Sequence, residues 1–137
     1  MTPHRLVSPD SLVRPSGYAH AVVAAPGRTV FVAGQIASGV DGVCRGDTIV
    51  EQFGFALDNV VTAMAAAGAS PGHLVSLEIF ATDLSSYRES SRELGVEYRA
   101  RFGHHYPAMA LLGVKELYDP AALVELVAVA VVPEGDR

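Results

Sequence analysis

The sequence predicts an α+β domain in which a mixed β-sheet of about six strands carries two helices on one face. Apolar residues alternate over several short segments, and in two longer segments they recur at helical spacing. These segments follow one another in the order ββαβαββ. Because 137 residues is the length of one domain, we expect residues 1–137 to form a single unit.

The N-terminal part predicts an irregular segment followed by a β-hairpin. Residues 1–16 contain three prolines and are expected to be an irregular lead-in. The segments 18–24 and 29–33 are rich in β-branched residues. A Pro-Gly pair between them is typical of a turn, so we expect the two strands to pair with each other.

The clearest element is a helix over residues 48–67. Thr48 and Glu51 have the spacing of a capping box, in which each side chain accepts a hydrogen bond from the other residue's backbone N–H. Apolar side chains then recur at helical spacing: Ile49, Phe53, Leu57, Val60 or Val61, and Met64. Gly68 suits the left-handed turn that ends such a helix, and Pro71 lies just beyond it.

A strand over residues 74–81 and a second helix follow. One side of the strand carries three apolar residues, Val75, Leu77 and Ile79. Ser86 and Glu89 have capping-box spacing and predict the start of the helix. Gly103 marks the expected end of this helix. The residues that recur at helical spacing along one face of it are Tyr87, Ser91, Leu94, Tyr98 and Phe102. A glycine inside a helix lowers helix stability by about 1 kcal/mol relative to Ala, so the sequence leaves open whether the helix is continuous through Gly95.

The last two strands indicate self-association. We expect them over residues 108–114 and 122–132, and the second is apolar on both faces. Helices cover only one face of the predicted sheet, which leaves residues such as Val127 and Val129 uncovered. Packing against identical subunits would cover them.

The composition argues against several classes of function. The net charge is −5 and the basic residues are dispersed, whereas nucleic-acid binding needs clustered cations that displace counterions. Cys44 is the only cysteine and the histidines lack ligand spacing, so we expect no metal site. The chain lacks a phosphate-binding loop and a nucleophile elbow, and we expect no cofactor. It also lacks a signal peptide or membrane span, which makes the cytosol the expected location.

A few residues could carry chemistry. Glu125 lies in an apolar strand, where a carboxylate is costly unless it is paired or protonated. It is either an edge or salt-bridged residue, or an acid that shuttles a proton or positions a water. Gly34-Gln35 either forms a turn or lets a ligand approach a backbone N–H closely. Tyr18 offers a phenol, although half-buried tyrosines are common in strands.

Short segments of the chain also form an ordered series, and each alone is weakly specific. They are Gly17-Tyr18, Phe31-Val32-Ala33-Gly34-Gln35-Ile36, Ala67-Gly68, Phe80-Ala81-Thr82-Asp83-Leu84, Tyr106-Pro107-Ala108 and Glu125. In register, over about residues 15–132, the series resembles the Rid (reactive-intermediate deaminase, YjgF-like) family.

The resemblance implies a chorismate-mutase-like fold that assembles as a homotrimer, with clefts for a small-molecule ligand between subunits. In the deaminases of the family, a glutamate activates the water that hydrolyses the C=N bond of an imine or enamine to a ketone and ammonia. Glu125 matches this glutamate. Tyr18 and Gly34-Gln35 match a tyrosine and a turn that help to hold the ligand.

One departure from the family pattern is chemically large. An arginine grips the substrate carboxylate in these deaminases, and Met109, which has no donor, occupies the matching position. Ala33 and Leu111 stand where a serine and a cysteine are common, so the expected site is more apolar. A replacement cation could come from another arginine of a neighbouring subunit, with the candidates Arg14, Arg88 and Arg92.

Three functions therefore stay open. The first is an imine or enamine hydrolase of altered specificity, and the second is a non-catalytic trimer that binds a small molecule in an apolar cleft. The third is a specialised pathway enzyme that acts on a cyclic or aromatic intermediate. Retention of Glu125 favours the first and third, whereas loss of the arginine favours the second and third. The endoribonuclease label sometimes used in the family gains little support from the acidic balance of the chain.

Overall fold

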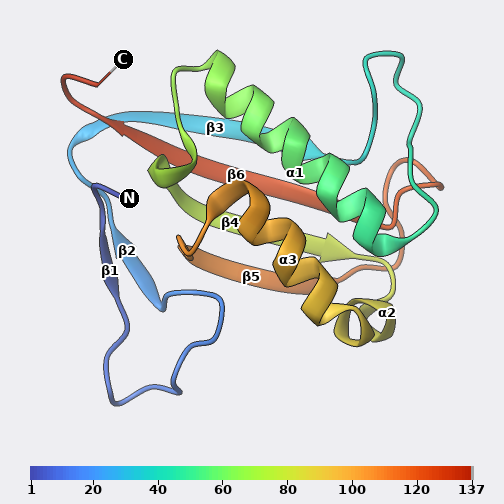
Figure 1. Cartoon of the computed structure of the whole chain (residues 1–137), viewed down its shortest axis with the longest axis horizontal. Helices are drawn as coiled ribbons and strands as arrows, with labels where there is room; N and C mark the ends of the chain where they lie inside the picture. Colours follow the sequence, from blue (N-terminus) through green and yellow to red (C-terminus); the bar gives the residue numbers. More distant parts are fainter. Residues whose placement is uncertain (137) are drawn as a thin grey trace.

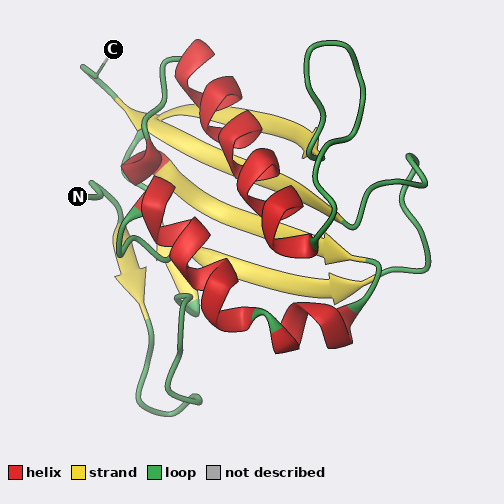
Figure 2. Ribbon diagram, turned by 45° about the vertical axis from the view of Figure 1, so that its right-hand side comes forward, coloured by secondary structure: helices red, strands yellow, loops and turns green. Residues whose placement is uncertain are grey.

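The structure, a computed structural model in which residues 1–136 are described, is built on a four-stranded sheet with the order β3-β6-β4-β5. In chain order the elements are β1 (Arg5–Val7), β2 (Ala21–Val23), β3 (Gly27–Gln35), α1 (Ile49–Ala66), a 3-10 turn (Pro71–His73), β4 (Leu74–Ala81), α2 (Leu84–Glu89), α3 (Ser91–Phe102), β5 (Ala108–Gly113) and β6 (Val124–Pro133). Strand β6 pairs antiparallel with β3 and β4, and β5 pairs parallel with β4. Helices α1 and α3 both cover one face of this sheet (Figures 1 and 2). The predicted α+β class is confirmed.

Helix α1 forms as predicted because its capping box is present. The Glu51 N–H donates to Thr48 Oγ1 over 3.2 Å, and the Thr48 N–H donates to Glu51 Oε1 over 3.1 Å. Gly68, with φ of 85°, follows its C-terminus. The buried stripe of the helix packs on β6 and β3, so it anchors the core.

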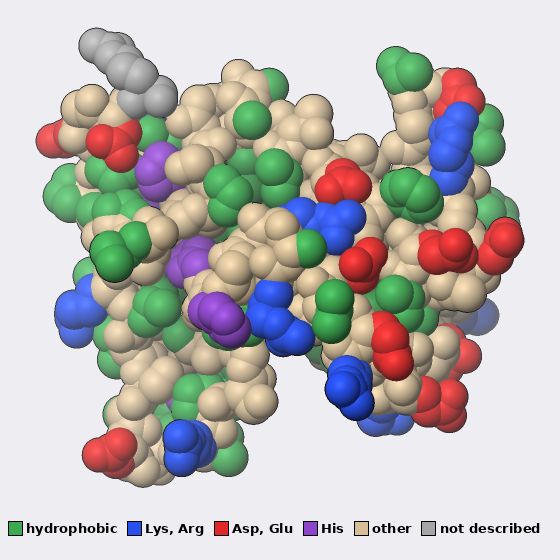
Figure 3. Space-filling view, viewed as in Figure 1, with side chains coloured by type: hydrophobic (Ala, Val, Ile, Leu, Met, Phe, Trp, Pro, Cys, Tyr) green, Lys and Arg blue, Asp and Glu red, His purple; other side chains and the backbone are tan. Residues whose placement is uncertain are grey.

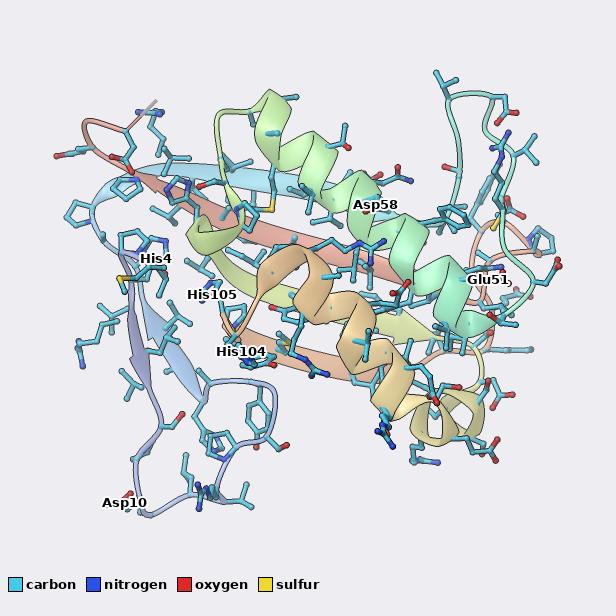
Figure 4. The ribbon with its side chains drawn as sticks, in the orientation of Figure 1. His4, Asp10, Glu51, Asp58, His104 and His105 are labelled. Atoms are coloured by element: carbon cyan, nitrogen blue, oxygen red, sulfur yellow. The ribbon has the colours of Figure 1, made fainter. Side chains whose placement is uncertain are left out.

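Helices α1 and α3 are joined by an ion pair above the core. Arg101 Nε lies 2.8 Å from Asp58 Oδ1 on α1 (Figure 4), and Arg101 Nη1 lies 3.6 Å from Glu97 Oε2 on its own helix. Gly54 of α1 permits the close approach, because a Cβ there would lie 2.6 Å from Glu97 Oε1. Other residues of α3, among them Arg92 and Arg99, line the pocket described below.

The predicted N-terminal hairpin is wrong. Strand β2 pairs with β1 in a separate two-stranded sheet, and β3 pairs with β6. Gly27 is a strand residue opposite Pro133 rather than a turn residue, and a Cβ there would collide with the backbone of Val132. The segment 1–16 is thus not wholly irregular, since it contains β1.

The N-terminal arm consists of residues 1–25, which include β1 and β2. Buried His4 fixes this arm to the main sheet. Its Nε2 lies 3.2 Å from the carbonyl oxygen of His73 and 3.1 Å from that of Val131. Its Nδ1 accepts from the Ala25 N–H over 3.0 Å, so Nε2 is the ring nitrogen that donates to the two carbonyls. Both nitrogens are satisfied, which makes this histidine a structural one.

The second predicted helix divides into two. Asp83 caps α2 by accepting from the Ser86 N–H over 3.1 Å, so the predicted capping box of Ser86 and Glu89 is wrong. The interruption lies at Ser90 and not at Gly95. Gly103, with φ of 59°, ends α3 as predicted. The break lets α2 turn away at the end of β4, and α3 lies along the β5 side of the sheet (Figure 1).

The face of the sheet opposite the helices is apolar and open. Phe31 is 80% exposed, and its register partner on β6 is Val129. Phe80 and Leu112 are paired on the same face at the β4–β5 edge. None of the helices in residues 1–136 is long and apolar enough to cross a membrane.

Gln52 of α1 is buried and binds two separate loops, so its loss should destabilise the fold. Its Nε2 donates to the carbonyls of Gly46 and Ala121 over 3.2 and 2.9 Å, and its Oε1 accepts from the Leu123 N–H over 2.7 Å. We expect Gln52→Ala to lower the free energy of unfolding by about 2–4 kcal/mol, because it strands buried polar groups.

Urea unfolding followed by circular dichroism measures this loss. Thr62→Ala, at an exposed position of the same helix, is the matched control and should change stability by less than about 0.5 kcal/mol. Equal stability of Gln52→Ala and the control would contradict the bridging role.

Candidate functional site

An open pocket of about 480 Å³ lies between α3, the β5 edge of the sheet and the loop that joins β1 to β2. A second pocket of about 370 Å³ adjoins it, and the two share Ser16, Gly17, Ile79, Tyr87 and Met109. Figure 3 shows this region as a notch between the N-terminal arm and the helices, with Lys and Arg side chains at its rim. The pocket is therefore bounded by segments from three parts of the chain.

The predicted site residues fall into two groups. The first group, Tyr18, Met109 and Leu111, lines the smaller pocket of about 370 Å³. The neighbouring backbone explains why. The Ala19 N–H donates to the Pro107 carbonyl over 3.0 Å, and Ala19 forms a parallel bridge with Ala108 at the start of β5. This bridge places Tyr18 beside the strand that carries Met109.

Met109 lies on the helix-covered side of the sheet. Its register partner on β4 is Leu77, which is fully buried under the helices, and Met109 packs against that core. An apolar thioether thus stands at the junction of the two pockets, at the position where the resemblance described above leads us to expect an arginine. The pocket floor can contact an apolar part of a ligand but offers no charge to it.

Three tyrosines, Tyr87, Tyr98 and Tyr106, contribute aromatic walls to the larger pocket. Tyr98 stacks on Tyr106 with 5.5 Å between ring centroids and donates its O–H to the His105 carbonyl over 2.7 Å. Tyr87 packs edge-to-face on Phe53 at 6.2 Å. Burial raises the pKa of both Tyr87 and Tyr98, so both phenols stay protonated and keep an O–H group. The sequence predicts Tyr87 and Tyr98 only as members of a helical stripe, and Tyr106 only as part of the segment Tyr106-Pro107-Ala108.

The second group of predicted site residues lies at the β3–β6 end of the sheet. Partly buried Glu125 contacts Gly34, where an added Cβ would collide with the Glu125 carboxylate. The β3–β6 register shifts between Val32 and Gln35, and Gln35 Nε2 donates to the Ala33 carbonyl over 3.1 Å. The lack of a side chain at position 34 therefore lets the Glu125 carboxylate lie against the strand, and it also suits the irregular end of β3.

Glu125 has no ionic partner among residues 1–136, so the salt bridge considered from the sequence is absent there. No side-chain hydrogen bond to Glu125 is formed within the same described part of the chain either. A partly buried carboxylate without a partner keeps its capacity to accept a proton or to bind water.

The two groups lie on opposite faces of the sheet. Glu125 is in register with Phe80 on the open face, whereas Met109 is in register with buried Leu77 on the helix side. Neither pocket is lined by Glu125, Gly34 or the residues beside it. One chain alone therefore does not bring all the predicted site residues together.

Of the three arginines that the sequence offers as a replacement cation, only one lines a pocket that Met109 also lines. Arg92 lines the larger pocket, whereas Arg14 lines a separate hollow within the N-terminal arm and Arg88 lines neither of the pockets beside Met109. Arg99, which sequence reasoning missed, also lines the larger pocket. Its seven-residue spacing from Arg92 on one helix is the signal that could have found it.

The histidines do not form a metal site in the described residues, which hold no group of three or more His, Cys, Asp or Glu side chains suited to an ion. His104 and His105 are adjacent in Figure 4, where α3 leads into β5. His105 Nε2 donates to the Leu74 carbonyl over 2.7 Å, and burial lowers the pKa of this imidazole. It therefore remains neutral and structural.

Together, the sheet order, the one-sided helices and the pocket at the β5 edge define a small α+β domain with an open pocket beside its edge strand. The family model described as Endoribonuclease L-PSP matches residues 10–132. The chain therefore belongs to the Rid family, also written YjgF/YER057c/UK114. No functionally curated protein sequence matches it significantly.

Solved structures of the family are similar over nearly the whole chain. The Rid protein YyfB of Yersinia pestis is 28% identical, with a TM-score of 0.81, over 94% of this chain and 98% of that one. Rv2704 of Mycobacterium tuberculosis is 33% identical, with a TM-score of 0.64, over 94% and 99%. Escherichia coli TdcF with bound serine is 26% identical, with a TM-score of 0.67, over 87% and 91%.

Proposed function

We propose that the protein hydrolyses the C=N bond of an imine, or of the imine tautomer of an enamine, at a site completed between subunits of a homotrimer. The observation that carries this proposal is Glu125, a partly buried carboxylate that has no ionic partner in residues 1–136 and contacts Gly34. A carboxylate kept in this state is costly unless it serves a ligand or a water.

Glu125 would act as the general base and then as the acid. It accepts a proton from a water whose oxygen adds to the carbon of the C=N bond, and the proton is then delivered to the nitrogen. The hydroxyl group of the resulting tetrahedral carbinolamine then gives up its proton, which Glu125 passes to the nitrogen. The C=O bond forms as the C–N bond breaks, and the products are a carbonyl compound and ammonia. Backbone groups beside Gly34 would hold the ligand against this carboxylate.

A partner subunit would supply the other half of the site. The open apolar face with Phe31 and Val129 is suited to a second copy of the chain, as expected for an apolar sheet face without helices. In a closed assembly, the Tyr18–Met109 pocket of one copy can approach the Glu125 end of the next. TdcF with bound serine supports a small ligand of amino-acid size.

Met109 favours a second candidate, a trimer that binds a small molecule without turning it over. The absence of an arginine at this position removes the usual hold on a carboxylate next to the C=N bond. We do not extend the endoribonuclease name of the family model to this chain, because neither described pocket is lined by a histidine and the net charge is −5.

Turnover of freshly generated 2-iminoacids by wild type and Met109→Arg tests the proposal. We expect slow turnover by wild type and a gain of about tenfold or more in kcat/KM with Met109→Arg, because Arg pairs with the adjacent carboxylate. Release of ammonia and of the 2-oxoacid is followed directly.

Met109→Leu keeps the position apolar and serves as the matched control, which should behave as wild type. A wild type as fast as Met109→Arg would show that another residue binds this carboxylate. Failure of both proteins on 2-iminoacids and on imines without a carboxylate would favour the non-catalytic candidate.

A further inference from the structure

Two arginines of α3 face the larger pocket from the same side of the helix. Arg92 and Arg99 are seven residues apart, which is close to two helical turns, and both line the pocket that Met109 also lines. Gly95 lies between them. An added Cβ at Gly95 would be 3.0 Å from Arg99 Nη1, so the guanidinium folds back along the helix over the glycine. The side chain thus extends from position 99 toward Arg92.

Both guanidinium groups are available to a ligand. Arg92 and Arg99 are exposed, and neither has an ionic partner among residues 1–136. In contrast, Arg101 on the same helix is held by Asp58 and Glu97. The two unpaired side chains are therefore not part of the interhelical ion pair.

The pocket walls carry no compensating charge. Arg92 and Arg99 are the only charged side chains that line either of the two pockets, and the lining contains no Asp or Glu. This local positive charge stands out because the chain as a whole has a net charge of −5. An anion that enters the pocket meets two guanidinium groups without a competing carboxylate.

We propose that Arg92 and Arg99 form an anion subsite for a substrate carboxylate that is separated from the C=N bond by an apolar spacer. This assignment of substrate class rests on the hydrolytic function proposed above. The spacer would lie along Met109, Tyr87 and Tyr106, which line the same pocket. A cation on the α3 wall and a thioether at the floor select an anion farther from the reacting atoms than the carboxylate of a 2-iminoacid.

Binding of two probes that differ only in charge tests the subsite without turnover. Isothermal titration calorimetry compares 3-phenylpropanoate with its neutral amide, 3-phenylpropanamide. We expect wild type to bind the carboxylate about tenfold more tightly or better, and Arg92→Met/Arg99→Met to lose this preference while the amide affinity stays unchanged. Arg88→Met is the matched control, because Arg88 is exposed on the preceding helix and lines neither pocket. It should retain the preference.

Several results would overturn the subsite: no measurable binding of the carboxylate, equal affinity of wild type for both probes, or a preference that survives in the double variant. Arg92→Lys/Arg99→Lys, which keeps the charge but loses the planar fork, should retain part of the preference. The result is independent of catalysis. If the double variant loses the charge preference and the control keeps it, the subsite is supported even when no imine is hydrolysed. If the protein hydrolyses imines but shows no charge preference, the subsite is contradicted and the proposed hydrolytic function is not.

Discussion

Glu125→Gln is expected to lower kcat for imine hydrolysis by about 10²–10⁴-fold while the fold and the assembly are retained. Gln has nearly the same shape as Glu but cannot accept the proton from the attacking water. Because Glu125 is partly buried and has no ionic partner in residues 1–136, removal of its charge should leave the free energy of unfolding unchanged or slightly higher.

Single-turnover kinetics on a rapidly generated imine, together with urea unfolding, measure both effects. Glu134→Gln is the matched control, since it removes the same charge at an exposed position just beyond the far end of β6 and should leave the rate unaltered. A rate for Glu125→Gln close to that of wild type would remove Glu125 from the chemistry. A large loss of stability without a specific loss of rate would assign it a structural role instead.

Phe31→Asp is expected to weaken the proposed homotrimer by about 10²-fold or more in dissociation constant. Phe31 is 80% exposed in the single chain, so Asp there should cost the fold little, whereas a carboxylate buried in an apolar interface is strongly unfavourable. Sedimentation velocity over a range of concentrations measures the shift from trimer to monomer.

Phe55→Asp provides the control for this substitution, because Phe55 is 46% exposed on α1, on the helix side of the sheet. It should leave the assembly intact. Hydrolytic activity should fall with the trimer in Phe31→Asp, since Glu125 and the Tyr18–Met109 pocket lie on opposite faces of one chain. A stable trimer in Phe31→Asp would show that the open face is not the interface.

The residues that define family membership differ from those to which the proposed activity is assigned. The structural comparisons and the fold follow the pattern of the core, which this chain shares with Rid proteins across most of its length. The pocket at the β5 edge carries Met109 on its floor and Arg92 and Arg99 on α3. The anion subsite proposed above would make these two arginines the residues that set substrate preference.

The sequence by itself determined the elements whose signals are local. The capping box of Thr48 and Glu51 and the apolar stripe after it predicted α1 within one residue at each end. Alternation predicted β4 over the residues that form it, Leu74–Ala81. The β5 and β6 segments were predicted within two residues at their ends, because their boundaries also follow from short apolar runs.

Tertiary structure decided what depends on partners far apart in the chain. Gly27 looked like a turn residue, yet the close backbone of Val132 makes it a strand residue, and β2 pairs with β1 instead. The faces on which Glu125 and Met109 lie were also fixed by register. Side chains alternate between the two faces of a sheet, so the pairing of β6 and β5 with β4 decides which residues can meet. No local pattern contains that information.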